Sequence, residues 1–125
     1  MRPFRGRRML LAEGDALTAG TITAMLHGLG ATVVGPAINT EIALDMARTE
    51  DFDLAILDLV LDGRRGFDVA EAVQHRSLPI VLTSPIDRAI DPQSLLYMPR
   101  IMKPFSAHEL TATLMVALKQ KGYTI

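Results

Sequence analysis

The sequence has no cysteine and no tryptophan, and aromatic residues make up only 5% of its 125 residues. The absence of cysteine excludes disulfide bonds, thiolate catalysis and cysteine-based zinc sites. No apolar run approaches the roughly 20 residues that a membrane-spanning helix needs. The formal net charge of -1 gives no general attraction to nucleic acid or to an anionic membrane. Any charged ligand must therefore be held by a local arrangement of side chains.

The length and composition fit one compact domain over residues 1–125, with 49% hydrophobic and 22% charged residues. Four arginines lie among the first eight residues, but Glu13 ends the apolar stretch that follows them too early for a secretory signal. We therefore expect residues 1–7 to be a solvated basic tail and residues 120–125 to be a C-terminal tail. The expected location is the cytoplasm, with neither a membrane nor a nucleic acid as partner.

Five short apolar runs lack strict alternation, which is typical of parallel strands covered on both faces. These runs are residues 9–12, 32–34, 54–57, 80–82 and 101–102. Segments with the apolar spacing of helices alternate with them. The positions predicted to face inward are Ile22, Leu26, Leu29, Ile42, Met46, Phe67, Ala70, Val73, Leu110, Leu114 and Leu118. The pattern predicts an α/β fold with a doubly wound, five-stranded parallel sheet.

The C-terminal third carries the clearest helix signal and the most irregular segment. Ser106, with Glu109 three residues later, predicts a capping box at the start of the last helix. Residues 84–100 contain three prolines, which disfavour a long regular helix, so we expect at most a short helix before Pro92. Because Pro99 lacks an amide donor, the run at 101–102 is expected to be an edge strand.

Four polar residues follow predicted strands at the point where each strand ends. They are Glu13, Asp58, Thr83 and Lys103. The carboxyl ends of parallel strands meet at one crevice, so these side chains are predicted to share one site. A carboxylate that attacks phosphorus becomes an acyl phosphate, whose charge must be neutralised. We predict Asp58 as that nucleophile, with a fixed positive charge from Lys103 and a hydroxyl hydrogen bond from Thr83.

Magnesium is the expected cofactor of such a site. The ion would bridge Asp58 and the phosphoryl oxygens, and it would take further ligands from water, another acid and a backbone carbonyl. Glu13 is the nearest candidate acid, and Gly14 stands where a second carboxylate would be expected beside it. Taken singly, the site residues have local explanations, such as a turn, a helix cap or a solvated surface charge. Their positions after four different strands favour a shared site.

The sequence resembles the receiver domain of two-component response regulators over residues 9–119. The matching segments are LLAEGD at the first predicted strand, LAILDLVLDGRRGFDVAEAV around the third, LPIVLTS at the fourth and IMKPF at the fifth. The resemblance implies that Asp58 is the phosphoacceptor, Thr83 the switch hydroxyl and Lys103 the phosphate-sensing lysine. It also implies a strand order of 2-1-3-4-5, a cis bond before Pro104 and a fourth helix reduced to a loop.

The resemblance also implies that the backbone carbonyl of Val60 is a magnesium ligand. Two positions depart from the family pattern. The acidic pair of the family falls at Glu13 and Gly14, which makes Asp15 a candidate substitute ligand. The switch aromatic of the family, three residues before the lysine, is replaced by Arg100.

The function implied by the resemblance is that of a stand-alone switch rather than a turnover enzyme. It would accept a phosphoryl group from a histidine kinase or a histidine phosphotransfer protein and signal by altered affinity for an unknown downstream protein. A receiver-like docking module that takes no phosphate is the alternative, motivated by Gly14 and Arg100. A flavin carrier would need a phosphate-cradling loop after the first strand, where Glu13 and Asp15 would instead repel phosphate.

Overall fold

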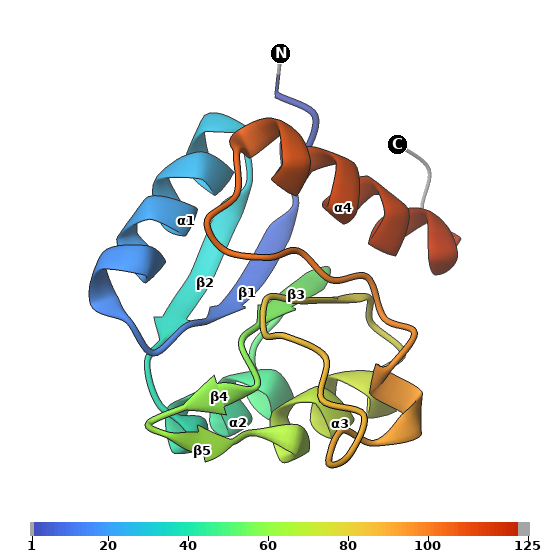
Figure 1. Cartoon of the computed structure of the whole chain (residues 1–125). Helices are drawn as coiled ribbons and strands as arrows, with labels where there is room; N and C mark the ends of the chain where they lie inside the picture. The colour runs from blue at the N-terminus through green and yellow to red at the C-terminus, as the bar shows by residue number, and fades with distance from the viewer. Residues whose placement is uncertain (1, 123–125) are drawn as a thin grey trace.

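A parallel β-sheet with helices on both faces forms the protein, which the computed structural model describes over residues 2–122, with the backbone alone at Arg64 and Arg65 (Figure 1). Four strands form this sheet in the order β2-β1-β3-β6. They are β1 (Arg8–Ala12), β2 (Thr32–Ala37), β3 (Leu54–Leu57) and β6 (Ile80–Leu82). The helices are α1 (Ala16–Gly28), α2 (Thr40–Thr49), α3 (Phe67–His75) and α4 (Ala107–Gln120). A small hairpin of β4 (Val60–Leu61) and β5 (Arg64–Arg65) follows β3.

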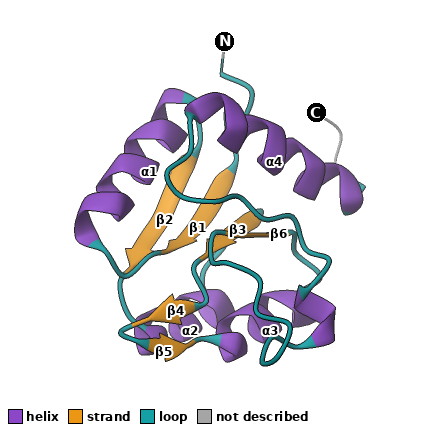
Figure 2. Ribbon diagram, viewed as in Figure 1, coloured by secondary structure: helices purple, strands orange, loops and turns teal. Residues whose placement is uncertain are grey.

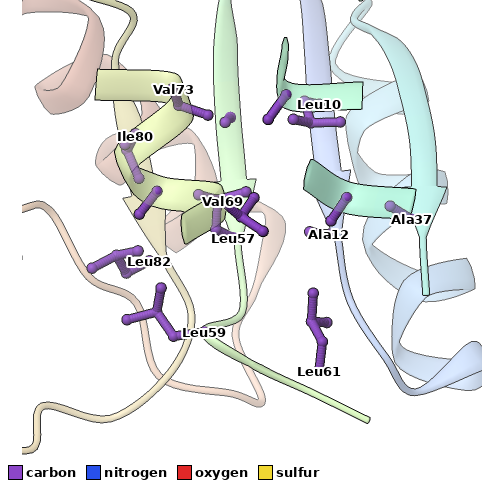
Figure 3. Close-up of a cluster of buried hydrophobic side chains, with 14 of the residues drawn as sticks. Leu10, Ala12, Ala37, Leu57, Leu59, Leu61, Val69, Val73, Ile80 and Leu82 are labelled. Atoms are coloured by element: carbon purple, nitrogen blue, oxygen red, sulfur yellow. The ribbon is translucent and has the colours of Figure 1, made fainter. Parts of the chain in front are cut away.

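The sheet separates two hydrophobic clusters, and α1 and α4 cover one face while α2 and α3 cover the other (Figure 1). In β1, Leu10 and Ala12 belong to the cluster under α2 and α3, which Figure 3 shows, whereas Met9 and Leu11 belong to the cluster under α1 and α4. Residues pointing to either face are buried, which explains why the strand sequences are apolar without alternation. The predicted doubly wound α/β fold is therefore confirmed.

The helices bury most of the positions that their spacing predicts. The predicted residues that are buried are Ile22, Leu26, Ala70, Val73, Leu110, Leu114 and Leu118. Ile42 was expected to face inward, but it is 41% exposed. Ala43 and Ala47 face the sheet instead, because their small side chains allow α2 to lie close to it. The prediction that Ile42 faces inward is therefore wrong, and the next residue, Ala43, is buried in its place.

The starts of α2 and α4 follow the capping rules. Glu109 donates its N–H to Ser106 Oγ at 3.0 Å, and Ser106 donates its N–H to Glu109 Oε1 at 3.2 Å. This reciprocal pair confirms the predicted capping box of α4. At the start of α2, Asn39 Oδ1 accepts a hydrogen bond from the N–H of Ile42 at 2.8 Å. Local side chains therefore fix where the chain turns from loop into helix.

The fifth strand position is reduced to one bridge. Arg100 pairs in parallel with Leu82, and the N–H of Ile101 donates to the carbonyl of Leu82 at 3.0 Å. Pro99 supplies no amide donor toward β6, so the ladder cannot lengthen before the bridge. The bond before Pro104 is cis, as the resemblance implies. The predicted order 2-1-3-4-5 agrees with the sheet, but the strand expected at 101–102 is not a regular strand in the described chain.

The segment between β6 and α4 is largely loop (Figure 2). Its regular piece within the described residues is the 3-10 helix η1 (Gln93–Leu95), which begins after Pro92. We expected any helix to lie before Pro92, and this prediction is wrong. Proline is well suited to precede a first turn, because that turn does not need its missing N–H. The predicted loss of a regular fourth helix agrees with the structure.

The described residues near the N-terminus pack against the domain. Phe4 is buried in the cluster under α1 and α4, and its N–H donates to the carbonyl of Leu29 at 3.0 Å. The N-terminal segment is therefore anchored rather than fully solvated. Gln120 still belongs to α4, while Met1 and residues 123–125 lie outside the described residues. Within residues 2–122, no helix is long and apolar enough to cross a membrane.

Candidate functional site

Three of the four predicted site residues lie one position beyond the ends of sheet strands. Glu13, Asp58 and Thr83 each donate their backbone N–H to the carbonyl of a neighbouring strand, at 3.0, 3.0 and 2.9 Å respectively. These bonds continue the sheet ladder past β1, β3 and β6. The backbone of each residue is therefore fixed by the sheet, although the three lie far apart in sequence.

Lys103 joins two of these residues. Its Nζ donates to Glu13 Oε1 at 2.7 Å and to Asp58 Oδ2 at 2.9 Å. The Glu13 side chain is 3% exposed, the Asp58 side chain 12% and the Lys103 side chain 31%. The ammonium group thus lies between a buried and a nearly buried carboxylate, while one side of it remains accessible to solvent.

The ionisation of Lys103 reflects two opposing effects. Burial disfavours the charged ammonium, but its hydrogen bonds to Glu13 and Asp58 and the negative charges of both carboxylates favour it. The second effect is larger in sum, and the pKa of Lys103 is raised above its ordinary value. Lys103 is therefore a permanent positive charge at physiological pH.

The other oxygen of Asp58 is held by the hairpin that follows β3. The N–H of Val60 donates to Asp58 Oδ1 at 2.9 Å, which orients the carboxylate toward Lys103. Thr83 is buried at the end of β6. The next residue, Ser84, accepts a hydrogen bond at its Oγ from the N–H of Leu59 at 3.3 Å. The ends of β3 and β6 are thereby connected directly beside Asp58.

Asp15, the predicted substitute ligand, caps α1 in the structure. Its N–H donates to Glu13 Oε2 at 3.0 Å, whereas its side chain accepts from the N–H of Thr18 at 2.8 Å and from the Thr18 hydroxyl at 2.6 Å. The hydroxyl bond first, and then the amide bond, lower the pKa of Asp15. The described hydrogen bonds therefore make the Asp15 carboxylate the N-cap of α1, and they do not join it to Asp58.

The donors near Lys103 are of the kind that binds magnesium. Glu13 and Asp58 offer oxygen atoms only, and Mg²⁺ is usually bound by one or two carboxylates together with several waters. In the described part of the chain, no group of three or more Asp, Glu or His side chains is arranged to hold a metal. Glycine at position 14 explains the missing third acid, so the site fits Mg²⁺ with two protein carboxylates.

A second charged cluster was not predicted from the sequence. Arg100 Nη2 lies 3.2 Å from Asp91 Oδ2, and both side chains are buried. The sequence marks Arg100 as a departure from the family pattern but carries no sign of its partner. An aspartate in a loop ordinarily lies in water, and only tertiary packing buries this one.

Comparison with known proteins agrees with the fold. The sequence matches the response regulator receiver domain over residues 9–115, and the chain belongs to this family. It is 31% identical over 121 residues to the transcriptional regulatory protein PdtaR of Mycobacterium tuberculosis, covering 91% of this chain and 58% of that protein. It is 36% identical over 112 residues to the response regulator protein PmrA of Pseudomonas aeruginosa, covering 84% of this chain and 49% of that protein. The chain spans about half the length of these curated relatives.

Solved structures give the same architecture. A CheY-like receiver domain from Methanospirillum hungatei has a TM-score of 0.78 at 20% identity, over 92% of this chain and 95% of that one. The receiver domain of the sensor histidine kinase PA1611 from Pseudomonas aeruginosa has a TM-score of 0.71 at 22% identity, over 94% and 99% of the two chains. That structure is described with a magnesium ion coordinated in its active-site cleft. Receiver domains act in phosphorelay signalling as switches rather than as turnover enzymes.

Proposed function

We propose that this chain accepts a phosphoryl group on Asp58 from a phosphohistidine of a histidine kinase or of a histidine phosphotransfer protein. The observation that carries the proposal is the position of the Lys103 ammonium, 2.9 Å from Asp58 Oδ2 and 2.7 Å from Glu13 Oε1. A cation held this way is already in place for the negative charge that develops when phosphorus is attacked.

The proposed reaction uses groups that the fold has fixed. An oxygen of Asp58 attacks phosphorus, the P–N bond of the phosphohistidine breaks, and its electron pair returns to the ring nitrogen. The resulting acyl phosphate carries more negative charge than the carboxylate did. Lys103 moves one of its hydrogen bonds to a phosphoryl oxygen, and the hydroxyl of Thr83 donates to another. Water later attacks the phosphorus, which releases inorganic phosphate and restores Asp58.

Glu13 and Asp58 would hold Mg²⁺, together with the backbone carbonyl of Val60. The bound ion supplies charge neutralisation at the phosphoryl oxygens. Because Gly14 contributes no carboxylate, we expect weak binding of the metal. Asp15 remains a candidate ligand only if it leaves its capping position at Thr18.

The output of the switch is proposed to be a change in affinity for a downstream protein, in the cytoplasm and without direct contact with nucleic acid. Leu17, in the first turn of α1, is 81% exposed and lies two residues after Asp15, whose N–H contacts the site carboxylate Glu13. A partner that approached the site at this end of the sheet would meet this side chain.

Intact-mass measurement tests the proposal. The protein is incubated with Mg²⁺ and acetyl phosphate, and separately with a panel of phosphorylated histidine phosphotransfer proteins. We expect the mass to rise by one phosphoryl group in the parent and to stay unchanged in Asp58→Asn. An unchanged mass of the parent with all donors would refute the assignment.

Gly14 motivates a second candidate function, a docking module that works without phosphate. In that case the parent and Asp58→Asn, each first incubated with a phosphoryl donor, would bind downstream partners with the same affinity. A difference in partner binding between the two proteins under these conditions would exclude the docking module.

A further inference from the structure

A charged groove lies between α2 and α3, on the face of the sheet opposite α1 and α4 (Figure 1). Its volume is about 460 Å³, and Arg48 of α2 forms one side of it. The other side is a single face of α3, made of Asp68, Glu71, Ala72, His75 and Arg76. These positions are spaced three or four residues apart, so their side chains project from the helix in the same direction.

The charges on this face are ordered along the helix. Asp68 and Glu71 belong to its first half, whereas His75 and Arg76 lie at its C-terminal end. The side chains of Glu71 and His75 are 72% and 78% exposed, and their nearest polar atoms are 3.9 Å apart. Among the described residues, the side chain of Asp68 has no hydrogen bond or ion pair. The helix dipole favours this order of charges, and the order has a second consequence.

The face of α3 is complementary to itself. Asp68 lies four residues before Ala72, and Arg76 lies four residues after it. In an antiparallel pair of α3 helices, a two-fold axis through Ala72 therefore places Asp68 of each copy opposite Arg76 of the other. Glu71 of each copy then approaches His75 of the other. A parallel pair would instead place like charges together, and the small Ala72 side chain lets the antiparallel helices approach closely.

We propose that this face of α3 is a self-association surface, on which a second copy of the chain packs its own α3 in the antiparallel direction. One of the charges is already held in place. Arg76 Nη1 donates to the carbonyl of Ala47 at 2.8 Å, and its guanidinium lies 4.6 Å from the ring centre of Phe52. Because the protomer holds this side chain, less side-chain freedom is lost when Asp68 of the second copy approaches it.

The composition of the face predicts a weak, reversible dimer. Exposed ion pairs contribute little to stability individually and are screened by salt. Ala72 is the one uncharged residue among the five of α3 that line the groove, whereas permanent dimer interfaces are more apolar. Association through α3 leaves α1 and α4 of both copies uncovered, because these helices lie on the other face of the sheet. A dimer would therefore present two copies of the opposite face to a partner.

Sedimentation equilibrium of the full chain tests the inference with two charge-reversed variants. Asp68→Lys with Glu71→Lys makes the face wholly basic, and His75→Glu with Arg76→Glu makes it wholly acidic. We expect the parent to dimerise with a dissociation constant that rises at least about tenfold from low to high salt. Each variant alone should be monomeric, because like charges then face each other. An equal mixture of the two variants should form a heterodimer, because their faces carry opposite charges.

Lys119→Glu with Lys121→Glu is the matched control. These lysines occupy the last turn and the C-cap of α4, as His75 and Arg76 do in α3, so the control reverses charge at equivalent positions on the other face of the sheet. It should dimerise as the parent does. Circular dichroism shows whether each variant is folded. If loss of the Arg76 bond to α2 unfolds the acidic variant, His75→Glu with Arg48→Glu takes its place.

The inference is independent of phosphorylation, so Asp58→Asn should associate as the parent does. A parent that stays monomeric at every concentration and salt condition overturns it. Folded variants that dimerise as strongly as the parent, or monomeric variants whose mixture does not associate, overturn it as well. None of these outcomes bears on the assignment of Asp58, which the mass measurement tests separately.

Discussion

Lys103 determines the charge balance of the site at the scale of single residues. Its ammonium group bonds to Glu13 and Asp58 at once, and its raised pKa keeps it charged. The positive charge between the two carboxylates offsets their mutual repulsion. The acid in the capping position, Asp15, stabilises α1 and orients Glu13 through its N–H, which is a structural contribution rather than a chemical one.

Removal of the Lys103 charge should destabilise the fold. In Lys103→Met, Glu13 and Asp58 repel each other, and the buried Glu13 loses its charged partner. Because Lys103 is partly exposed and water screens it, we expect the free energy of unfolding at pH 7 to fall by about 1–2 kcal/mol. Urea denaturation of parent, variant and the exposed-lysine control Lys119→Met measures this loss, and an equal effect of both substitutions would contradict it.

The same variant predicts a pH dependence. Since the pKa of Lys103 is raised in the folded protein, its contribution is fully present below the pKa of the unfolded chain, about 10.4, and is lost as pH rises through the folded value. The stability difference between parent and Lys103→Met should be constant from neutral pH to about pH 10 and should shrink above it. A difference that vanished near neutral pH would argue against a permanent cation.

Gly14 offers a direct test of metal binding. A Cβ at this position would meet its nearest neighbours at 3.6–3.8 Å, which is ordinary van der Waals contact, so a side chain fits. Gly14→Asp adds the missing carboxylate, and we expect its affinity for Mg²⁺ to exceed that of the parent by at least about tenfold. Calorimetric titration measures this change. Gly14→Asn is the uncharged control, and equal affinities of the two variants would contradict the account.

At the scale of elements, the sequence predicts the features that depend on neighbouring residues, such as buried strands and helix caps. The strands at 54–57 and 80–82 and the capping box at Ser106 are correct, because burial of a whole strand and a cap depend on adjacent residues. The predictions for the inward face of α2 and for the position of the 3-10 helix are wrong. For α2, tertiary packing decides whether Ile42 or Ala43 faces the sheet. The proline-rich loop is also held by the contact of Arg100 with Asp91, nine residues apart, and this burial depends on tertiary packing.

The capping box of α4 has a measurable contribution. Ser106→Ala removes the acceptor for the Glu109 N–H, and we expect the free energy of unfolding to fall by about 1 kcal/mol. Thr111→Ala is the control within the same helix. The Thr111 hydroxyl bonds only to the carbonyl one turn earlier, so its loss should change the free energy by a few tenths of a kcal/mol at most, roughly. Equal losses in the two variants would show that the box adds no stability.

At the scale of the whole molecule, the parallel sheet brings together residues that are far apart in the sequence. Lys103 lies 90 residues from Glu13 and 45 from Asp58, yet it bonds to both. This meeting could be predicted from the sequence, because every parallel strand ends at the same edge. The direct bond between Lys103 and Glu13 could not, since the pattern indicates Glu13 only as a metal ligand. Side-chain pairing within a site depends on distances that strand order does not fix.

Chemical trapping of the phosphorylated residue tests the central claim most directly. Borohydride reduces an aspartyl phosphate to homoserine, and peptide mass mapping then locates the altered residue after incubation with a phosphohistidine donor. The account predicts homoserine at position 58 in the parent and much less of it in Lys103→Met. Homoserine at the position of another acidic residue would contradict the assignment of Asp58. So would phosphate transfer from the donor to this protein without any homoserine.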